Sequence, residues 1–180
     1  MGNEGVRMST KGSWWLLVVL TVMLLATHAS AQNTLWEKYN DAGKNAFQQG
    51  RYAETEKQFK AALKEAEQFG SEDPRLAATL NNLADVYRAQ GKYALAEPLY
   101  QRALAIFEKA PGPEDSIVAV SLNRLAGLYH AQGKYTQAEP LYQRALAINE
   151  KLLGPEDPNV ALNLDNLGAF YNAQGKYAQA

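Results

Sequence analysis

Apolar residues recur at helical spacing in two neighbouring segments of the chain, and a short polar stretch separates them. In the first segment, successive apolar residues lie three, one and three positions apart. In the second segment, the apolar residues run over 93–107. Between them lies Ala89-Gln90-Gly91-Lys92, a turn in which Gly91 can take the left-handed backbone conformation that ends many helices. Such stripes face a core when a segment forms an amphipathic α-helix. The pattern therefore predicts two antiparallel helices, the first with its stripe at Leu80, Leu83, Ala84 and Tyr87.

This helix pair is one unit of an internal repeat. The tripeptide Gly-Lys-Tyr begins at Gly91, Gly133 and Gly175, at a constant spacing of 42 residues. The segment 96–106 recurs without change as residues 138–148. A period of this length is typical of stacked units that are each too small to bury their apolar face alone. We therefore predict an all-α fold, an α-solenoid of antiparallel helix pairs.

Acidic residues precede the predicted first helix of each pair. Asp73-Pro74 and Asp157-Pro158 combine an N-cap side chain with a proline at the first helical position, and Asp115-Ser116 keeps the cap. Within one second helix, Thr136 and Glu139 predict a capping box. We interpret the neighbouring acidic pairs as caps, because acid–base catalysis would require them to face a shared cleft. These pairs are Glu72-Asp73, Glu114-Asp115 and Glu156-Asp157.

The first 31 residues have a different pattern. Arg7 and Lys11 make the start mildly basic, residues 14–26 are uncharged and largely apolar, and Ala29-Ser30-Ala31 follows shortly after. This layout predicts a secretory signal peptide over 1–31, a mature chain beginning at Gln32, and a secreted or periplasmic location. The alternative is an uncleaved membrane anchor, although a bilayer span needs about 20 apolar residues. A lipoprotein anchor is not expected, because the chain contains no cysteine.

Composition narrows the chemistry of the remaining residues, 32–180. Without Arg7, Lys11 and Glu4, the 18 basic and 19 acidic side chains of the chain become 16 and 18. This balance gives no basic patch of the kind that nucleic-acid binding requires. His130 is the one histidine left after residue 31, and there is no cysteine, so neither a metal site nor a catalytic His–Cys pair is expected. We predict a protein without cofactor, metal or enzymatic activity.

The repeated residues resemble the tetratricopeptide repeat, whose pattern combines small, aromatic and glycine positions. The resemblance covers about 36–180, with units at 36–76, 77–118, 119–160 and an incomplete 161–180. The 42-residue period and the string at 80–84 are similar to the subtype found in kinesin light chains. Trp36 to Leu63 fits more loosely, because Ala46 and Thr55 replace the expected aromatic and small residues. The matching positions are Ala84, Tyr87, Gly91, Tyr93, Ala96, Tyr100 and Ala103, and then Ala126, Tyr129, Gly133, Tyr135, Ala138, Tyr142 and Ala145.

The resemblance implies a concave groove, lined by the first helices, that holds an extended peptide or a protein segment. Asparagine carries a donor and an acceptor, so a row of asparagines could pair with a peptide backbone. Arg88 and Arg124 could add charge-assisted bonds to a carboxylate. The alternative is a solvated polar face. The predicted groove residues are Asn81, Asn82, Asp85, Arg88, Asn123, Arg124, His130, Asp165, Asn166 and Asn172.

These expectations together describe an exported, non-enzymatic scaffold that binds a peptide or protein partner. Two alternatives remain open at this stage. The repeats could be the regulatory arm of a larger extracytoplasmic enzyme, for example a caspase-like peptidase, that continues beyond Ala180. They could also form a self-assembling structural protein, joined as a homo-oligomer through the uncapped last helix. The tyrosines that recur with the period are interpreted as packing residues.

Overall fold

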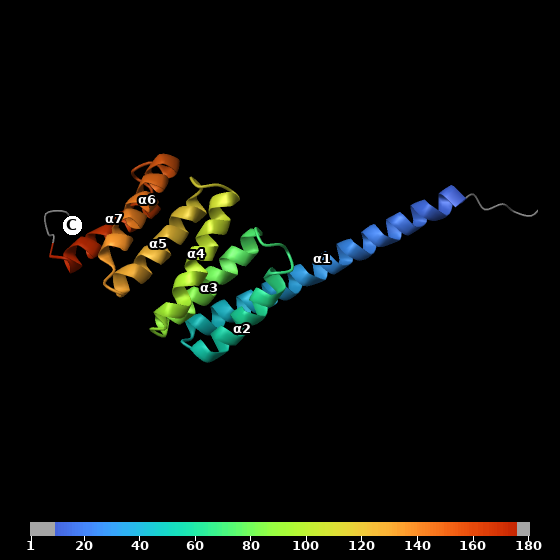
Figure 1. The fold of residues 1–180 in the computed structure, drawn as a ribbon, viewed down its shortest axis with the longest axis horizontal. Coiled ribbons are helices and arrows are strands. Elements are labelled where there is room, and N and C mark those ends of the chain that lie inside the picture. Colours follow the sequence, from blue (N-terminus) through green and yellow to red (C-terminus); the bar gives the residue numbers. More distant parts are fainter. Residues whose placement is uncertain (1–9, 176–180) are drawn as a thin grey trace, which may run out of the picture.

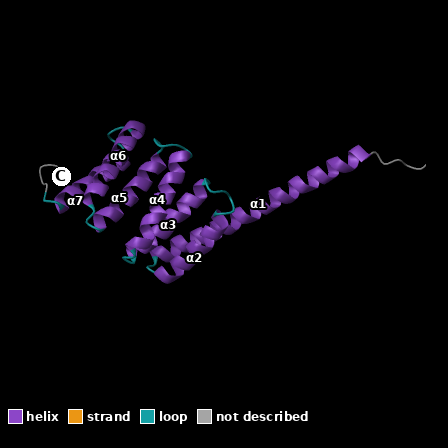
Figure 2. Ribbon diagram, in the orientation of Figure 1, coloured by secondary structure: helices purple, strands orange, loops and turns teal. Residues whose placement is uncertain are grey.

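The computed structural model describes residues 10–175, and all the regular secondary structure in that range is helical (Figures 1 and 2). The predicted all-α class is confirmed. The seven helices within residues 10–175 are α1 (Thr10–Gln48), α2 (Tyr52–Ala66), α3 (Pro74–Ala89), α4 (Tyr93–Lys109), α5 (Ser116–Ala131), α6 (Tyr135–Leu153) and α7 (Pro158–Ala173).

The helices stack as consecutive pairs along one direction (Figure 1). Helices α1 and α2, α3 and α4, and α5 and α6 pack most extensively, and each second helix then packs on the first helix of the next pair. The first helices also contact one another, α1 with α3 and α3 with α5. This arrangement confirms the predicted α-solenoid, and it places α1, α3, α5 and α7 in one row.

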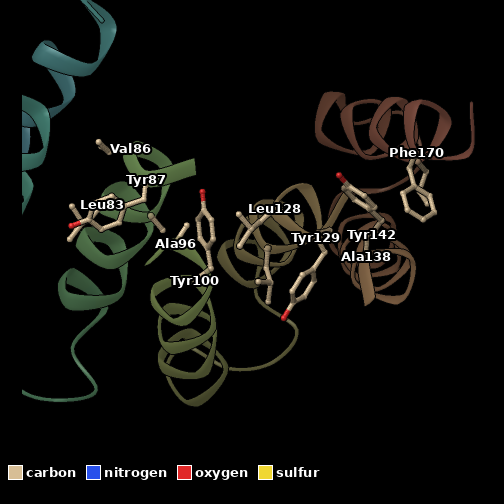
Figure 3. Close-up of a cluster of buried hydrophobic side chains, with 14 of the residues drawn as sticks. Leu83, Val86, Tyr87, Ala96, Tyr100, Leu128, Tyr129, Ala138, Tyr142 and Phe170 are labelled. Carbon is tan, nitrogen blue, oxygen red and sulfur yellow. The ribbon is translucent and has the colours of Figure 1, made fainter. Parts of the chain in front are cut away.

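Small and aromatic side chains alternate in the core between the pairs. Ala84, Ala96, Ala126 and Ala138 are completely buried, and these small side chains allow the helices to approach closely. The rings of Tyr100 and Phe170, among others, fill the remaining space (Figure 3). The interpretation of the repeated tyrosines as packing residues is confirmed for those in the described range.

The repeated tyrosines of the first helices also carry a polar contact at their outer ends. The hydroxyl of Tyr87 donates to Glu56 over 3.3 Å, that of Tyr129 to Glu97 over 3.3 Å, and that of Tyr171 to Glu139 over 3.0 Å. Each contact joins a first helix to the second helix of the preceding pair. A tyrosine can therefore be buried through its ring and still satisfy its hydroxyl.

The predicted caps of the first helices are present. Asp73, Asp115 and Asp157 are N-cap residues, and each accepts a hydrogen bond from the backbone N–H two residues later, over 2.8 to 2.9 Å. These bonds satisfy N–H groups that have no partner within the helix.

The predicted capping box at Thr136 is wrong. Helix α6 already begins at Tyr135, with Lys134 as its N-cap residue and no side-chain cap. The preceding Gly133 has a φ of 70°, and the N–H of Lys134 bonds to the carbonyl of Tyr129 over 2.9 Å. This glycine turn closes α5 and leads directly into α6, so Pro140 lies further inside the helix than the capping box implied.

Helix α1 continues without a break through the predicted boundary between Ala31 and Gln32. Its contacts with the stacked pairs begin just after that boundary: Asn33 accepts from Arg75 over 2.8 Å, and Trp36 donates to Thr79 over 2.8 Å. Trp14, Trp15 and the large apolar side chains from Leu17 to Leu25 are exposed. Within the described range, the segment Leu17–Gln48 is long and apolar enough to cross a membrane by length and composition.

Candidate functional site

The row of first helices carries two neighbouring hollows, and we call this surface the first-helix face. The first hollow, of about 240 Å³, is formed by α1, the ring of Phe59 from α2, α3 and Arg124. The second hollow, of about 360 Å³, lies between α3, α5, α6 and α7. Arg124 lines both, so the two hollows adjoin at this side chain and together make up the candidate site. The predicted groove residues that line them are Asn82, Asp85, Arg88, Asn123, Arg124 and Asn166.

A charged cluster around Asp85 lies where the hollows meet. Nη1 of Arg124 is 3.1 Å from Oδ2 of Asp85, and Nη2 of Arg88 is 3.9 Å from Oδ1. The hydroxyl of Tyr100 donates to the same carboxylate. Burial raises the pKa of Tyr100, and the negative charge of Asp85 raises it further, so the phenol stays protonated as a donor. Two arginines around one aspartate leave this cluster with an excess positive charge.

The asparagines of the predicted row differ in how exposed their side chains are. Asn82 and Asn166 are half-buried, and Nδ2 of Asn82 donates to Oδ1 of Asn40 over 3.0 Å. Asn81 is buried and donates to Oγ of Ser121 over 2.9 Å, in a contact between α3 and α5. Asn123 donates to Oδ1 of Asn163 over 3.0 Å. Hydrogen bonds between neighbouring first helices therefore already use some of the side-chain amide groups in this row of asparagines.

Four predicted groove residues lie outside both hollows, and the buried Asn81 is one of them. Asp165 and Asn172 are exposed on α7. The ring of His130 packs against those of Tyr135 and Phe170, with centroid distances of 5.9 and 5.5 Å. The imidazole is therefore part of an aromatic cluster at the α5–α7 contact, and the structure does not bring it to the charged cluster.

Two buried asparagines at the base of the second hollow were not predicted. Asn149 and Asn163 line it, although they are only 4% and 1% exposed. Nδ2 of Asn149 donates to Oδ1 of Asn163 over 3.5 Å. Within the described part of the chain, Oδ1 of Asn149 and Nδ2 of Asn163 have no hydrogen-bond partner.

A sequence signal for these asparagines existed in the repeat itself. Asn149 stands where the preceding unit has Phe107, immediately after the segment that is identical in both units. Asn163 stands where the preceding unit has Ser121. A departure from an otherwise repeated pattern was therefore a better guide to these positions than the family's groove positions.

The candidate site offers hydrogen-bond donors and acceptors together with positively charged side chains. Over residues 10–175, no group of three or more histidine, cysteine, aspartate or glutamate side chains is placed to hold a metal ion. The first-helix face combines amide groups, two arginines and exposed apolar side chains, among them Val120 and Leu162 in the second hollow. Such a surface suits an extended polypeptide, which has regularly spaced backbone donors and acceptors and side chains of varied chemistry.

The fold is a stack of helix pairs, and its candidate binding site lies along the row of first helices. This combination is typical of helical-repeat scaffold proteins. Comparison with known families identifies tetratricopeptide repeats over residues 35–109 and 117–180. This chain therefore belongs to the tetratricopeptide repeat family. Members of this family typically act as scaffolds for protein–protein interactions, and the fold is generally non-catalytic.

Solved structures show the same architecture. BtubC (BKLC) from P. vanneervenii is 31% identical with a TM-score of 0.76, and the match covers 83% of this chain and 60% of BtubC. A candidate kinesin light chain from Podosopora anserina with nearly identical TPR-like repeats is 26% identical with a TM-score of 0.71, over 78% of this chain and 67% of that one. These neighbours confirm the resemblance to kinesin light chains.

A more distant neighbour shares the fold alone. The N-terminal domain of stress-induced protein-1 (STI-1) from C. elegans is 18% identical with a TM-score of 0.56, and the match covers 76% of this chain and 97% of that domain. No curated protein sequence matches the chain.

Proposed function

We propose that this protein captures an extended segment of a partner protein along the first-helix face. The observation that carries the proposal is that two hollows adjoin at Arg124 along the row of first helices. Adjoining hollows that extend over several helices fit an extended polypeptide better than a compact small molecule. The family's typical use as an interaction scaffold supports the same function.

In this proposal the asparagines hold the backbone of the partner. Asn82 and Asn166 lie in different hollows, and each side-chain amide can donate to a peptide carbonyl and accept from a peptide N–H. Backbone contacts of this kind bind a strand without selecting its side chains. Selection would come from the charged cluster, where Arg88 and Arg124 outnumber Asp85.

The test is the selection of peptides from a library of random dodecapeptides displayed on phage, with the full chain immobilised. We expect the wild-type chain to enrich a family of related peptides, and the double variant Asn82→Ala plus Asn166→Ala to lose that enrichment. Asn45→Ala serves as the matched control, because Asn45 is exposed on α1 and lines neither hollow. Circular dichroism should show equal helical content in all three proteins.

Two results of this selection would contradict the proposal. One is the absence of any enriched family on the wild-type chain. The other is an enriched family that the double variant still captures as well as the Asn45→Ala control does, because the site would then lie elsewhere.

We further propose that the protein acts outside the cytoplasm and that residues 1–31 direct its export. The exposure of Trp14, Trp15 and the large apolar side chains from Leu17 to Leu25 supports this, because the stacked pairs provide no surface that covers them. The contacts of α1 with the pairs begin near Gln32, so removal of residues 1–31 would leave those of Asn33 and Trp36 in place.

A further inference from the structure

Two successive repeats carry the same buried tyrosine but differ in the residue that faces it. Tyr100 and Tyr142 occupy the same place in the repeat, and so do Asp85 and Gly127, each pair being 42 residues apart. In the earlier unit, the hydroxyl of Tyr100 donates to Asp85. In the later unit, Gly127 has no side chain, so this position offers no acceptor to the hydroxyl of Tyr142 beside it. The second hollow therefore lacks the carboxylate that the first unit supplies itself.

The donors that would surround such a carboxylate are nevertheless present. Gly127 lines the second hollow together with Arg88 and Tyr142. A Cβ atom placed on Gly127 would lie 3.5 Å from Nη1 of Arg88 and 3.6 Å from the hydroxyl oxygen of Tyr142. Guanidinium and phenol groups both donate hydrogen bonds to carboxylates, and the guanidinium bond is assisted by charge. The space above Gly127 is thus flanked by two donors.

The charge of the neighbourhood also favours an added anion. Asp85 pairs with Arg124 over 3.1 Å but with Arg88 only over 3.9 Å, so Arg88 is the more weakly engaged arginine. Burial raises the pKa of Tyr142, and its phenol is therefore a protonated donor at neutral pH. One further carboxylate would balance the two arginines.

Packing does not require glycine at position 127. The distances of 3.5 and 3.6 Å from an added Cβ are ordinary van der Waals contacts, and the residue lies within the regular helix α5. Glycine in a helix interior lowers stability, and the equivalent positions hold Asp85 and Ala169. The effect of Gly127 is to leave open a space that an aspartate fills in the preceding unit.

We propose that the second hollow binds the side-chain carboxylate of an aspartate or glutamate in the captured peptide, above Gly127, with Arg88 and Tyr142 as donors. The inference rests on the proposed function, because the peptide on the first-helix face carries the carboxylate. A side chain fits better than a peptide C-terminus. The site continues to α1 on one side and to α7 on the other, so the bound chain can extend in both directions.

The first test needs no ligand and compares Gly127→Asp with Gly127→Asn in the full chain. The two side chains have nearly the same size and similar helix propensity, so a difference in thermal midpoint reports the charge. If the space is a carboxylate site, Gly127→Asp should have the higher thermal midpoint, because its carboxylate bonds to Arg88 and Tyr142. An equal or lower midpoint than that of Gly127→Asn would overturn the assignment.

The second test is an NMR titration of the full chain with three small probes. N-acetyl-aspartic acid N-methylamide should shift the amide signal of Gly127 and bind about tenfold more tightly than the asparagine analogue. Tyr142→Phe, which keeps the ring in the core, should reduce this preference. Equal affinity of the aspartate and asparagine probes would overturn the proposal. N-acetyl-alanine, with its free terminal carboxylate, should bind more weakly, and equal binding would overturn the side-chain assignment.

The failure of this inference is distinguishable from the failure of the proposed function. If the phage library yields a peptide family without a required acidic residue, peptide capture stands and the carboxylate inference is overturned. If the aspartate probe binds as expected but the library yields no peptides, the carboxylate site is supported and peptide capture is contradicted.

Discussion

At the scale of single residues, two helical glycines differ in what surrounds them. A Cβ atom on Gly43 would lie 2.5 Å from Cε1 of Phe59, whose ring is buried in the core, whereas a Cβ on Gly127 meets only ordinary contacts. Gly43 is therefore needed for the close approach of α1 and α2. Gly127 is not needed for packing.

We expect Gly43→Ala to lower the free energy of unfolding by about 1–3 kcal/mol, because the added methyl group displaces the Phe59 ring. Gly127→Ala should raise it by about 0.5–1 kcal/mol through better helix propensity. Urea unfolding followed by circular dichroism measures both. A stabilising effect of Gly43→Ala would contradict the packing of this first unit.

The N-cap aspartates give a second prediction at this scale. Asp115→Ala should lower the free energy of unfolding by about 1 kcal/mol, because the N–H of Ile117 loses its acceptor. Asp115→Asn is the matched control and should cost much less, since asparagine caps equally well. If the two variants are equally destabilised in urea, the cap is not the cause.

The residues of the site could be predicted from the sequence only where they follow the family pattern. Asn82 and Arg124 were predicted from their positions, and both line the site. Asn149 and Asn163 were not predicted, because a residue in a second helix or at a contact position is expected to pack rather than to line a hollow. His130 was predicted from its position, but the neighbouring rings that enclose it come from α6 and α7.

At the scale of helices, successive pairs are joined by repeated polar contacts as well as by the core. Nζ of Lys134, at the start of α6, is 2.9 Å from Glu97 of α4, and Tyr129 of α5 donates to the same carboxylate. In the preceding unit, Lys92 and Tyr87 meet Glu56 in the same way. One glutamate thus contacts the following helix pair in each unit.

These contacts predict a loss of stability in acid. The hydrogen bond from Lys134 holds the pKa of Glu97 below its ordinary value of 4.5. The pKa of Glu56 is lowered mainly by a hydrogen bond from Lys60 within α2, and the charge of Lys92 from the next pair adds to this. Because the folded pKa is the lower one, the stabilisation is fully present above the unfolded pKa and is lost as the pH falls through the folded pKa. The urea midpoint should therefore fall between about pH 5 and pH 3.

The variant Glu97→Gln isolates one of these contacts. It should be less stable than the wild-type chain at pH 7 and should lose less stability on acidification, because the neutral amide does not titrate. Equal pH dependence of the two proteins would show that Glu97 does not contribute. The carboxylate is partly exposed, so solvent screening keeps the effect small.

The helices themselves were largely predictable, because apolar stripes, glycine turns and aspartate caps recur with the 42-residue period. The start of α6 was predicted wrongly, since the glycine turn at Gly133 sets that start and the side chain of Thr136 does not. The continuation of α1 through residue 31 was not predicted either. An uncharged apolar segment has no residue that ends a helix, so it extends the helix that follows it.

At the scale of the whole molecule, the proposed export predicts a processed chain. The intact mass of the native protein from the extracytoplasmic fraction should correspond to a chain whose first residue is Gln32. A mass that retains residues 1–31, in a protein found in the membrane fraction, would contradict cleavage and support the exposed apolar helix as an anchor. A protein confined to the cytoplasm would contradict export.

The central claim is that a partner lies along the first-helix face. The most direct measurement is a two-dimensional NMR titration of the full chain with a peptide that the wild-type chain enriches from the library. The account predicts that the side-chain amide signals of Asn82 and Asn166 shift, together with backbone signals of α3, α5 and α7. Shifts centred instead on Glu114 and Lys151, which line a separate hollow of about 330 Å³ beside α6, would contradict it.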